Sequence, residues 1–98
     1  MAVYIVGQLR VTNWDWYKEY RSITEPLVAR HGGKYVIKGG NPQAVEGAGA
    51  DALVVIEFPS REQARRWYDD PEYTAMIALR NKSGVETQLL LADGFEEK

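Results

Sequence analysis

The chain has 98 residues, of which 45% are hydrophobic and 27% are charged, and its formal net charge is −2. These values predict one folded domain, and scattered basic residues in an acidic chain argue against a nucleic-acid partner. The absence of cysteine excludes disulfide bonds, thiolate nucleophiles and cysteine-ligated metal sites. Because no apolar run could span a bilayer and the first residues lack the features of a secretory signal, we expect a cytoplasmic protein with no membrane partner.

The first third of the chain predicts a strand, a long helix and a short second strand. Residues 2–11 alternate between two faces that both begin apolar, so this strand is expected to be covered on both sides. Thr12 and Asp15 have the spacing of a capping box, which predicts a helix that begins at Thr12. Gly32 is expected to end this helix in the left-handed conformation, before a second strand over residues 34–38. The apolar stripe of the helix is predicted to be Trp16, Tyr20, Ile23 and Leu27.

The middle of the chain predicts a loop, a strand and a second helix. Residues 39–50 are rich in Gly, Pro and Ala, which is typical of a loop. Residues 52–58 form an apolar run that predicts the third strand. Ser60 and Gln63 have the spacing of another capping box, so a helix is expected over residues 61–68.

The remaining elements complete an α+β domain. Asp70 is expected to cap, and Pro71 to begin, a further helical segment that runs to about Arg80, and residues 85–92 predict the last strand. The order β-α-β-β-α-β is typical of the ferredoxin-like fold, in which a four-stranded antiparallel sheet has its helices on one face. We expect this single domain over residues 1–95 and a short acidic tail over residues 96–98.

The predicted sheet has a face that no helix covers. In a monomer that face should be polar, yet three of the predicted strands carry apolar side chains on both faces. An apolar second face needs a partner, and burying such side chains stabilises by roughly 1.5–3 kcal/mol each. We therefore expect a homodimer in which two sheets pair as a dimeric α/β barrel. The alternative is a monomer with exposed aliphatic side chains.

Five segments together carry a resemblance to one bacterial family: WDWYKEYR (residues 14–21), HGGKYVIKGG (31–40), VVIEFPS (54–60), ARRWYDDPEY (64–73) and ALR (78–80). The family is the domain-of-unknown-function family 1330, and the resemblance extends over nearly the whole chain. It implies the fold of the dimeric α/β-barrel superfamily. Relatives in that superfamily include cofactor-free monooxygenases, muconolactone isomerases, haem-handling enzymes and stress-response barrels. Because the family has no established reaction, the resemblance assigns no catalytic residue.

Two residues are candidates for a catalytic base. Glu57 is a lone carboxylate in an apolar strand, where a desolvated carboxylate can act as a base. The alternative is a structural ion pair with Arg10 or Lys38. His31, the single histidine, could abstract a proton or ligate haem iron. The alternative for His31 is a residue at a helix end, where an imidazole faces the negative end of the helix dipole.

Four further side chains are candidates for ligand binding. Tyrosines could line a cleft between the helices and the sheet and hydrogen-bond a ligand. Arginines on the predicted helices could hold a carboxylate, although a solvated helix face is their usual environment; this applies to Arg21, Arg30 and Arg80. One histidine and no cysteine leave no cluster of metal ligands, so neither a metal nor another cofactor is expected. The ligand-binding candidates are Tyr17, Arg21, Tyr35 and Tyr68.

These features are compatible with three functions. The first is a cofactor-independent enzyme that acts on a small, partly apolar metabolite, with Glu57 or His31 as the base and a tyrosine that orients the substrate. The second is a non-catalytic metabolite-binding or stress-associated dimer, which predicts that an Arg or Lys neutralises Glu57 and that side chains fill the pocket. The third is a haem-binding protein that uses His31.

Overall fold

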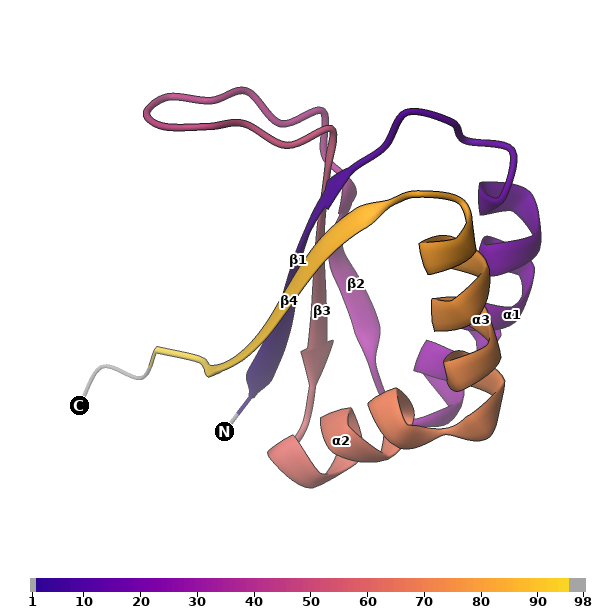
Figure 1. The fold of residues 1–98 in the computed structure, drawn as a ribbon. Helices are drawn as coiled ribbons and strands as arrows, with labels where there is room; N and C mark the ends of the chain where they lie inside the picture. The colour runs from indigo at the N-terminus through magenta and orange to yellow at the C-terminus, as the bar shows by residue number, and fades with distance from the viewer. Residues whose placement is uncertain (1, 96–98) are drawn as a thin grey trace.

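The structure, a computed structural model, describes residues 2–95 as a four-stranded sheet with three helices on one face (Figure 1). All strand pairs are antiparallel and the sheet order is β2-β3-β1-β4, which confirms the predicted α+β class and antiparallel sheet. The predicted acidic tail over residues 96–98 lies outside the described residues. The elements are β1 (Val3–Arg10), α1 (Tyr17–Arg30), β2 (Lys34–Gly39), β3 (Ala52–Phe58), α2 (Arg61–Asp69), α3 (Pro71–Lys82) and β4 (Glu86–Asp93).

The two central strands supply the core because each places a row of apolar side chains beneath the helices. In β1, Val3 and Ile5 are 3% and 5% exposed, and they pair with Phe58 and Ile56 of β3, which are 0% and 3% exposed. The alternation predicted for β1 is therefore confirmed, and β3 alternates in register with it. Because successive side chains of a strand point to opposite faces, the intervening residues form the outer face of the sheet.

Helix α1 begins five residues later than predicted, at Tyr17, and its N-cap residue makes no side-chain cap hydrogen bond. The capping box expected at Thr12 is wrong, because Asn13 instead accepts a hydrogen bond from the backbone N–H of Asp15 at 2.9 Å. An Asx turn of this kind competes with a helical start. The end was predicted correctly, since Gly32 adopts a φ of +83° directly after the helix.

The buried stripe of α1 also differs from the prediction. Ile23 is 39% exposed, whereas Thr24 is 3% exposed and faces the sheet together with Leu27. The difference follows from helix geometry. Trp16, Tyr20 and Thr24 are four residues apart at each step, so their side chains lie on the same face of the helix. A polar hydroxyl is thereby buried in place of an aliphatic side chain.

Helices α2 and α3 begin with the capping residues that the sequence predicts. The Ser60 hydroxyl accepts a hydrogen bond from the Gln63 backbone at 3.2 Å, and the Asp70 carboxylate accepts one from the Glu72 backbone at 2.9 Å. Pro71 occupies the first position of α3, where its missing N–H has no intrahelical partner to lose. The chain therefore changes direction at Asp70, and α3 returns alongside α1 (Figure 1).

Strand β2 contains an irregularity that changes which side chains face the helices. Tyr35 pairs with Ile56, but Ile37 pairs with Val55, so the register shifts at the intervening residue. A bulge of this kind places an extra residue in one strand and reverses its alternation. As a result both Tyr35 and Lys38 lie on the helix side of the sheet, where a regular strand would have placed Lys38 on the opposite face.

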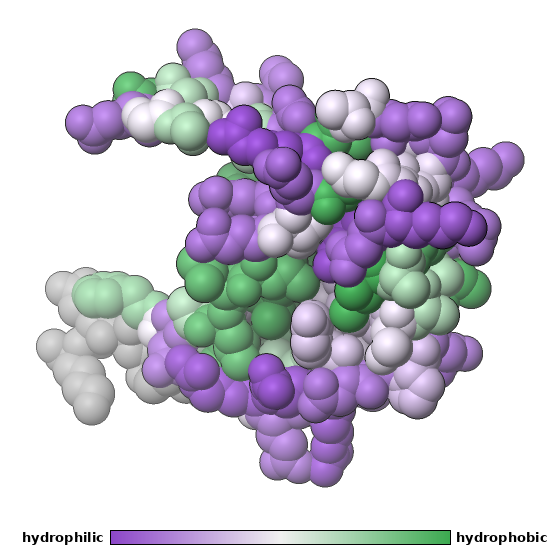
Figure 2. Space-filling model, viewed as in Figure 1, coloured by the Kyte–Doolittle hydropathy of each residue, from purple (hydrophilic) through white to green (hydrophobic). Residues whose placement is uncertain are grey.

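The outer face of the sheet has no helix over it and carries apolar side chains. Leu90 is 55% exposed and Val36 is 53% exposed, and Val6 and Val55 are half-buried neighbours across β1 and β3. Figure 2 shows hydrophobic side chains gathered in the recess beneath the projecting loop between β2 and β3, residues 40–51. This loop extends away from the helices (Figure 1).

Candidate functional site

A cavity of about 80 Å³ lies between the sheet and the helices. Every helix and strand contributes at least one residue to its lining, from Leu9 in β1 to Leu89 in β4. Its walls are largely aromatic, and Trp16 packs edge-on against Tyr20 with ring centroids 5.1 Å apart. A concave, mostly apolar cavity with a few polar groups is the common form of a small-molecule site.

A chain of three polar side chains lies at the α1–α3 side of the cavity. The Tyr20 and Tyr73 hydroxyl oxygens are 3.0 Å apart, and the Arg80 Nη1 donates to the Tyr73 hydroxyl at 3.2 Å. Tyr73 is 1% exposed and Arg80 is 5% exposed. Burial raises the pKa of the Tyr73 phenol, because the ionised form is poorly solvated there. Tyr73 therefore stays a neutral hydrogen-bonding group beside a buried guanidinium.

Four buried polar side-chain atoms have no hydrogen-bond partner among residues 2–95, and all four belong to residues that line this cavity. Buried polar groups are nearly always hydrogen-bonded, so each exception needs an explanation. Four exceptions around one cavity indicate a site for a polar occupant. The atoms are Thr24 Oγ1, Trp67 Nε1, Arg80 Nε and Thr87 Oγ1.

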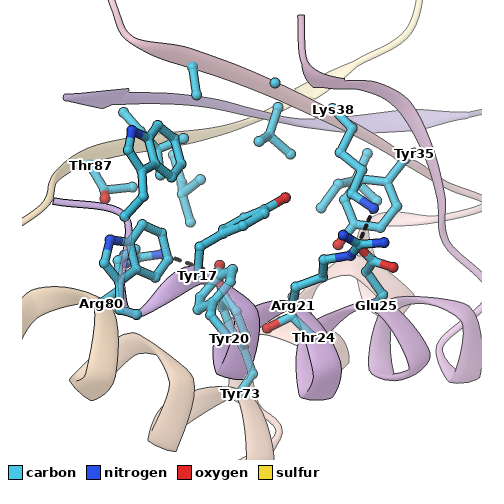
Figure 3. A pocket seen from close by; sticks show the side chains of 18 of the residues that line it. Tyr17, Tyr20, Arg21, Thr24, Glu25, Tyr35, Lys38, Tyr73, Arg80 and Thr87 are labelled. Atoms are coloured by element: carbon cyan, nitrogen blue, oxygen red, sulfur yellow. Dashed lines mark hydrogen bonds and ion pairs between the residues drawn. The ribbon is translucent and has the colours of Figure 1, made fainter. Parts of the chain in front are cut away.

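The opposite end of the cavity carries an ion-pair cluster. Arg21 Nε lies 2.9 Å from the Glu25 carboxylate, which also pairs with Lys38. Lys38 in turn lies over the ring of Tyr35, with Nζ 5.1 Å from the centroid. Figure 3 shows this cluster at one end of the cavity, Arg80 and Thr87 at the other, and Tyr17 between them. Arg21 is the most exposed of the three charged side chains, at 59%.

The residues that line the cavity carry a net positive formal charge although the chain as a whole is acidic. Three lining side chains are cationic, namely Arg21, Lys38 and Arg80, and one, Glu25, is anionic. Burial raises the pKa of the Tyr35 phenol, so this ring also remains neutral. The charges that surround the cavity therefore favour a negatively charged or strongly hydrogen-bond-accepting molecule.

Three of the four predicted ligand-binding residues line the cavity: Tyr17, Arg21 and Tyr35. The fourth, Tyr68, does not line it. Tyr68 packs edge-on against the far side of Trp67, with ring centroids 6.3 Å apart, and has the Arg65 guanidinium over its ring. Its predicted role in binding stays a prediction.

Glu57 lies on the outer face of the sheet, away from the cavity lining. Its carboxylate accepts a hydrogen bond from the Tyr4 hydroxyl at 3.1 Å and lies 3.5 Å from Lys34 Nζ. The hydrogen bond to this carboxylate raises the pKa of the Tyr4 phenol. An ion pair was one of the alternatives predicted for Glu57, but the expected partners were wrong, because Lys38 lies on the other face and pairs with Glu25.

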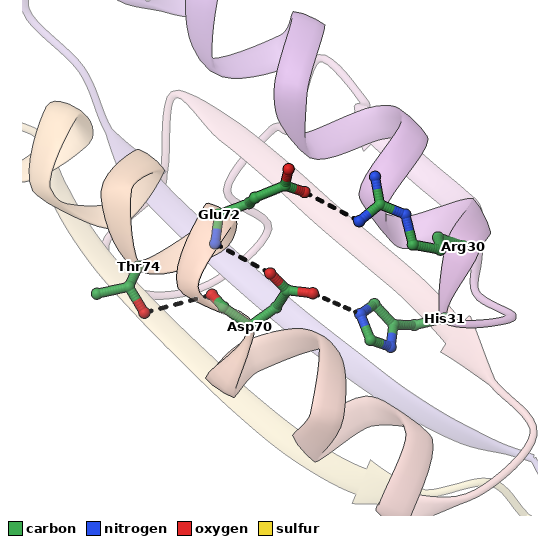
Figure 4. Close-up of polar contacts among 5 residues, drawn as sticks. All are labelled: Arg30, His31, Asp70, Glu72 and Thr74. Carbon is green, nitrogen blue, oxygen red and sulfur yellow. Dashed lines mark hydrogen bonds and ion pairs between the residues drawn. The ribbon is translucent and has the colours of Figure 1, made fainter.

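His31, the second candidate base, lies at the end of α1 and joins two helices. Its Nε2 donates to the Asp70 carboxylate at 2.9 Å, while Arg30 Nη1 lies 3.0 Å from Glu72 (Figure 4). The hydrogen bond from His31, together with that from the Glu72 backbone, lowers the pKa of Asp70. His31 is not part of the cavity lining, so the cavity does not bring the two candidate bases together.

Of the polar groups at the Arg80 end of the cavity, the sequence pointed only to Arg80, as one of three helix arginines that could hold a carboxylate. Arg80 was expected on a solvated helix face, and this expectation is wrong because Arg80 is 5% exposed. A usable signal existed, since Tyr73 and Arg80 are seven residues apart, which puts them on the same face of α3 two turns from each other. Thr24 and Thr87 gave no comparable signal, because threonine is common on helices and strands alike.

Among residues 2–95, no group of three or more His, Asp or Glu side chains lies close enough together to hold a metal ion. No helix in this part of the chain is long and apolar enough to cross a membrane.

Comparison with known proteins places the chain in a family and a fold. The model of the family described as "Domain of unknown function (DUF1330)" matches residues 2–95. The crystal structure of methylated RPA0582 protein is 20% identical, with a TM-score of 0.76, over 97% of this chain and 82% of the other. A structure of the RPA0582 protein of unknown function from Rhodopseudomonas palustris is 19% identical, with a TM-score of 0.74, over 98% and 84%. No curated protein matches.

Proposed function

This chain belongs to the DUF1330 family, and we propose that it is a homodimeric protein that binds a small, partly apolar molecule in the cavity between the sheet and the helices. The observation that carries the proposal is that the four buried polar atoms without a partner among residues 2–95 all belong to residues that line that one cavity. Leaving one such group unsatisfied costs about 1–3 kcal/mol. A ligand that supplies the missing hydrogen bonds would recover much of this free energy on binding.

Binding is favoured over catalysis by Glu57 or His31 because neither residue lines the cavity. The second function predicted from the sequence agrees with the environment of Glu57, whose carboxylate has Tyr4 and Lys34 beside it. It disagrees in one respect, because side chains do not fill the cavity. Haem ligation by His31 would require its Nε2 to leave the Asp70 carboxylate. The site therefore supports a metabolite-binding protein.

The dimer is proposed through the outer face of the sheet, with a second copy of the chain as the partner. All three helices lie on the other face (Figure 1), and the outer face carries the half-buried Val6 and Val55 and the 55% exposed Leu90. The β2–β3 loop, whose Val45 is 99% exposed, projects past this face. Pairing of two such sheets would bury these side chains and would place each loop against the other subunit.

Tryptophan fluorescence can test the proposed cavity directly. Trp14, Trp16 and Trp67 are the three tryptophans of the chain, and all three line the cavity. The protein is titrated with four probes of similar size, namely 1-propanol, propionamide, propylamine and propionate, while fluorescence and melting temperature are recorded. At least one probe is expected to give a saturable fluorescence change and a higher melting temperature, since a ligand selective for the native state stabilises it.

A variant that fills the cavity provides the control. Ala52 is 6% exposed and lines the cavity, so Ala52→Leu should abolish the response, whereas Leu53→Ile on the outer face should keep it. Circular dichroism checks folding, and Val54→Leu is the milder filling variant if Ala52→Leu is unfolded. A cavity occupied only by water would give no saturable response to any of the four probes, and this result would overturn the proposal.

A further inference from the structure

We propose that the molecule bound in the cavity is a small organic carboxylate and that the guanidinium of Arg80 holds its charged group. This inference rests on the proposed function and specifies the chemical class of the ligand. It starts from the environment of Arg80, which is 5% exposed and has no carboxylate within 4.0 Å among residues 2–95. Buried charges in proteins are paired or ligand-bound, because an isolated buried ion is strongly unfavourable.

Among residues 2–95 the Arg80 side chain makes one hydrogen bond, which leaves its guanidinium with unused N–H donors. Its Nη1 donates to Tyr73, a neutral phenol, while its Nε has no partner. A guanidinium carries five N–H donors in a planar fork that matches the two oxygens of a carboxylate. The Tyr73 hydroxyl orients the fork but cannot neutralise it.

The other unpartnered atoms restrict the ligand further. Arg80 Nε and Trp67 Nε1 can only donate hydrogen bonds, and the Thr24 and Thr87 hydroxyl groups can donate as well as accept. The occupant must therefore supply acceptors, and an ionised carboxylate is an acceptor without donors. A cationic amine has the opposite character and would also face the lining cations Arg21 and Lys38.

The size and walls of the cavity point to an organic acid. A volume of about 80 Å³ corresponds to roughly two or three water molecules of the liquid, which suits an acid with a short carbon chain. Leu9 and Val54 line the sheet side and Tyr17 lies across the space. These apolar surfaces would contact the carbon chain while the carboxylate faces Arg80. A longer acid would require Tyr17 to move toward the exposed end.

Propionate and propionamide are similar in size and differ in charge, so their comparison measures the contribution of the ligand's charge to binding. Both are titrated against the full-length protein at constant ionic strength, with tryptophan fluorescence as the readout. Propionate is expected to bind at least about tenfold more tightly than propionamide, because a hydrogen bond to an ionised group is roughly twice as strong as a neutral one. Sodium chloride at the same concentration is the reference for a site that accepts any anion.

The Arg80→Gln variant tests whether Arg80 is responsible for the preference for propionate over propionamide. This variant should bind propionate and propionamide with similar dissociation constants, so the tenfold ratio falls to about one, while propionamide still binds. Arg66→Gln removes an exposed arginine of α2 that pairs with Glu62 outside the cavity, and it should keep the full ratio. The comparison of the two probes on the unaltered chain decides the carboxylate assignment even if Arg80→Gln does not fold.

The possible failures are distinguishable. Equal affinity for propionate and propionamide would overturn the carboxylate assignment and leave the proposed cavity standing. A response to chloride equal to that of propionate would also overturn it, because the site would then select an inorganic anion. Retention of the propionate preference in Arg80→Gln would overturn the role of Arg80. The absence of any response to all four probes would instead refute the proposed function.

Discussion

The Tyr73 side chain connects the core of the molecule to the candidate site. Its ring stacks on Trp67 with centroids 4.3 Å apart, and its hydroxyl contacts both Tyr20 and Arg80. The ring contributes apolar burial, while the hydroxyl is the one hydrogen-bond acceptor of the Arg80 side chain among residues 2–95. The same residue therefore stabilises the fold and orients the guanidinium that we propose to bind the ligand.

Tyr73→Phe is expected to lower the free energy of unfolding by about 1–3 kcal/mol, because it leaves the buried Arg80 Nη1 without its acceptor. Urea denaturation followed by circular dichroism measures the change. Tyr68→Phe is the matched control, since the Tyr68 hydroxyl makes no hydrogen bond among residues 2–95, and its effect should stay within about 0.5 kcal/mol. Equal effects of the two substitutions would contradict the assigned role.

At the scale of the elements, the junction between α2 and α3 is held by Asp70. One carboxylate oxygen accepts from the Glu72 backbone and caps α3, and the other accepts from His31 at the end of α1. These two hydrogen bonds lower the pKa of Asp70, with that from His31 as the larger cause. Three helix ends thus meet at one ionised side chain (Figure 4).

The lowered pKa predicts a specific dependence of stability on pH. In the unfolded chain the pKa of Asp70 is near its ordinary value of 3.8, whereas in the folded protein it is lower. As the pH falls, the unfolded chain therefore takes up this proton first. The carboxylate therefore stabilises the fold above that value, and the contribution is lost as the pH falls through the folded pKa. Asp70→Asn keeps an oxygen that can cap the helix but removes the charge.

At neutral pH, Asp70→Asn is expected to melt several degrees below the unaltered protein, and the gap should close as the pH is lowered from about 5 to about 2. Differential scanning calorimetry across this range measures the gap. Asp69→Asn, one residue earlier and exposed, serves as the control and should show a small difference at every pH. A gap for Asp70→Asn that does not change with pH would refute this account of the junction.

At the scale of the whole molecule, the sheet separates a covered face from an open one. The covered face holds the cavity and most of the core, whereas the open face presents Leu90 and Val36, which are 55% and 53% exposed. An apolar sheet face next to a projecting loop favours association with a second copy. The proposed dimer interface and the proposed ligand site thus lie on opposite faces of the same sheet.

Sedimentation velocity tests the proposed dimer. A Val6→Lys, Leu90→Lys double variant puts two charges on the outer face and should weaken self-association by at least about 100-fold, because each buried unpaired charge is costly. The control is Ile23→Lys, which replaces an apolar residue of α1 that is 39% exposed and lies away from the sheet, so self-association should be unchanged. A monomeric unaltered chain at high protein concentration would overturn the dimer proposal.

Local sequence determined the elements whose boundaries depend on nearest neighbours. The caps at Ser60 and Asp70 and the left-handed Gly32 follow from hydrogen bonds and backbone freedom within a few residues. The strand over residues 52–58 follows from its short apolar run. The start of α1 was missed because two local motifs compete there, and the turn at Asn13 prevails.

The candidate site was decided by tertiary structure. Alternation in β2 does not predict the bulge that brings Lys38 to Tyr35 and Glu25. Arginine on a helix is normally solvated, and Arg80 is buried only because α3 packs against α1 over the sheet. The periodicity of the sequence determines which side of a helix or strand is apolar. Whether a buried polar atom has a hydrogen-bond partner depends on all the elements that pack around it. For that reason the cavity can be recognised only in the folded chain.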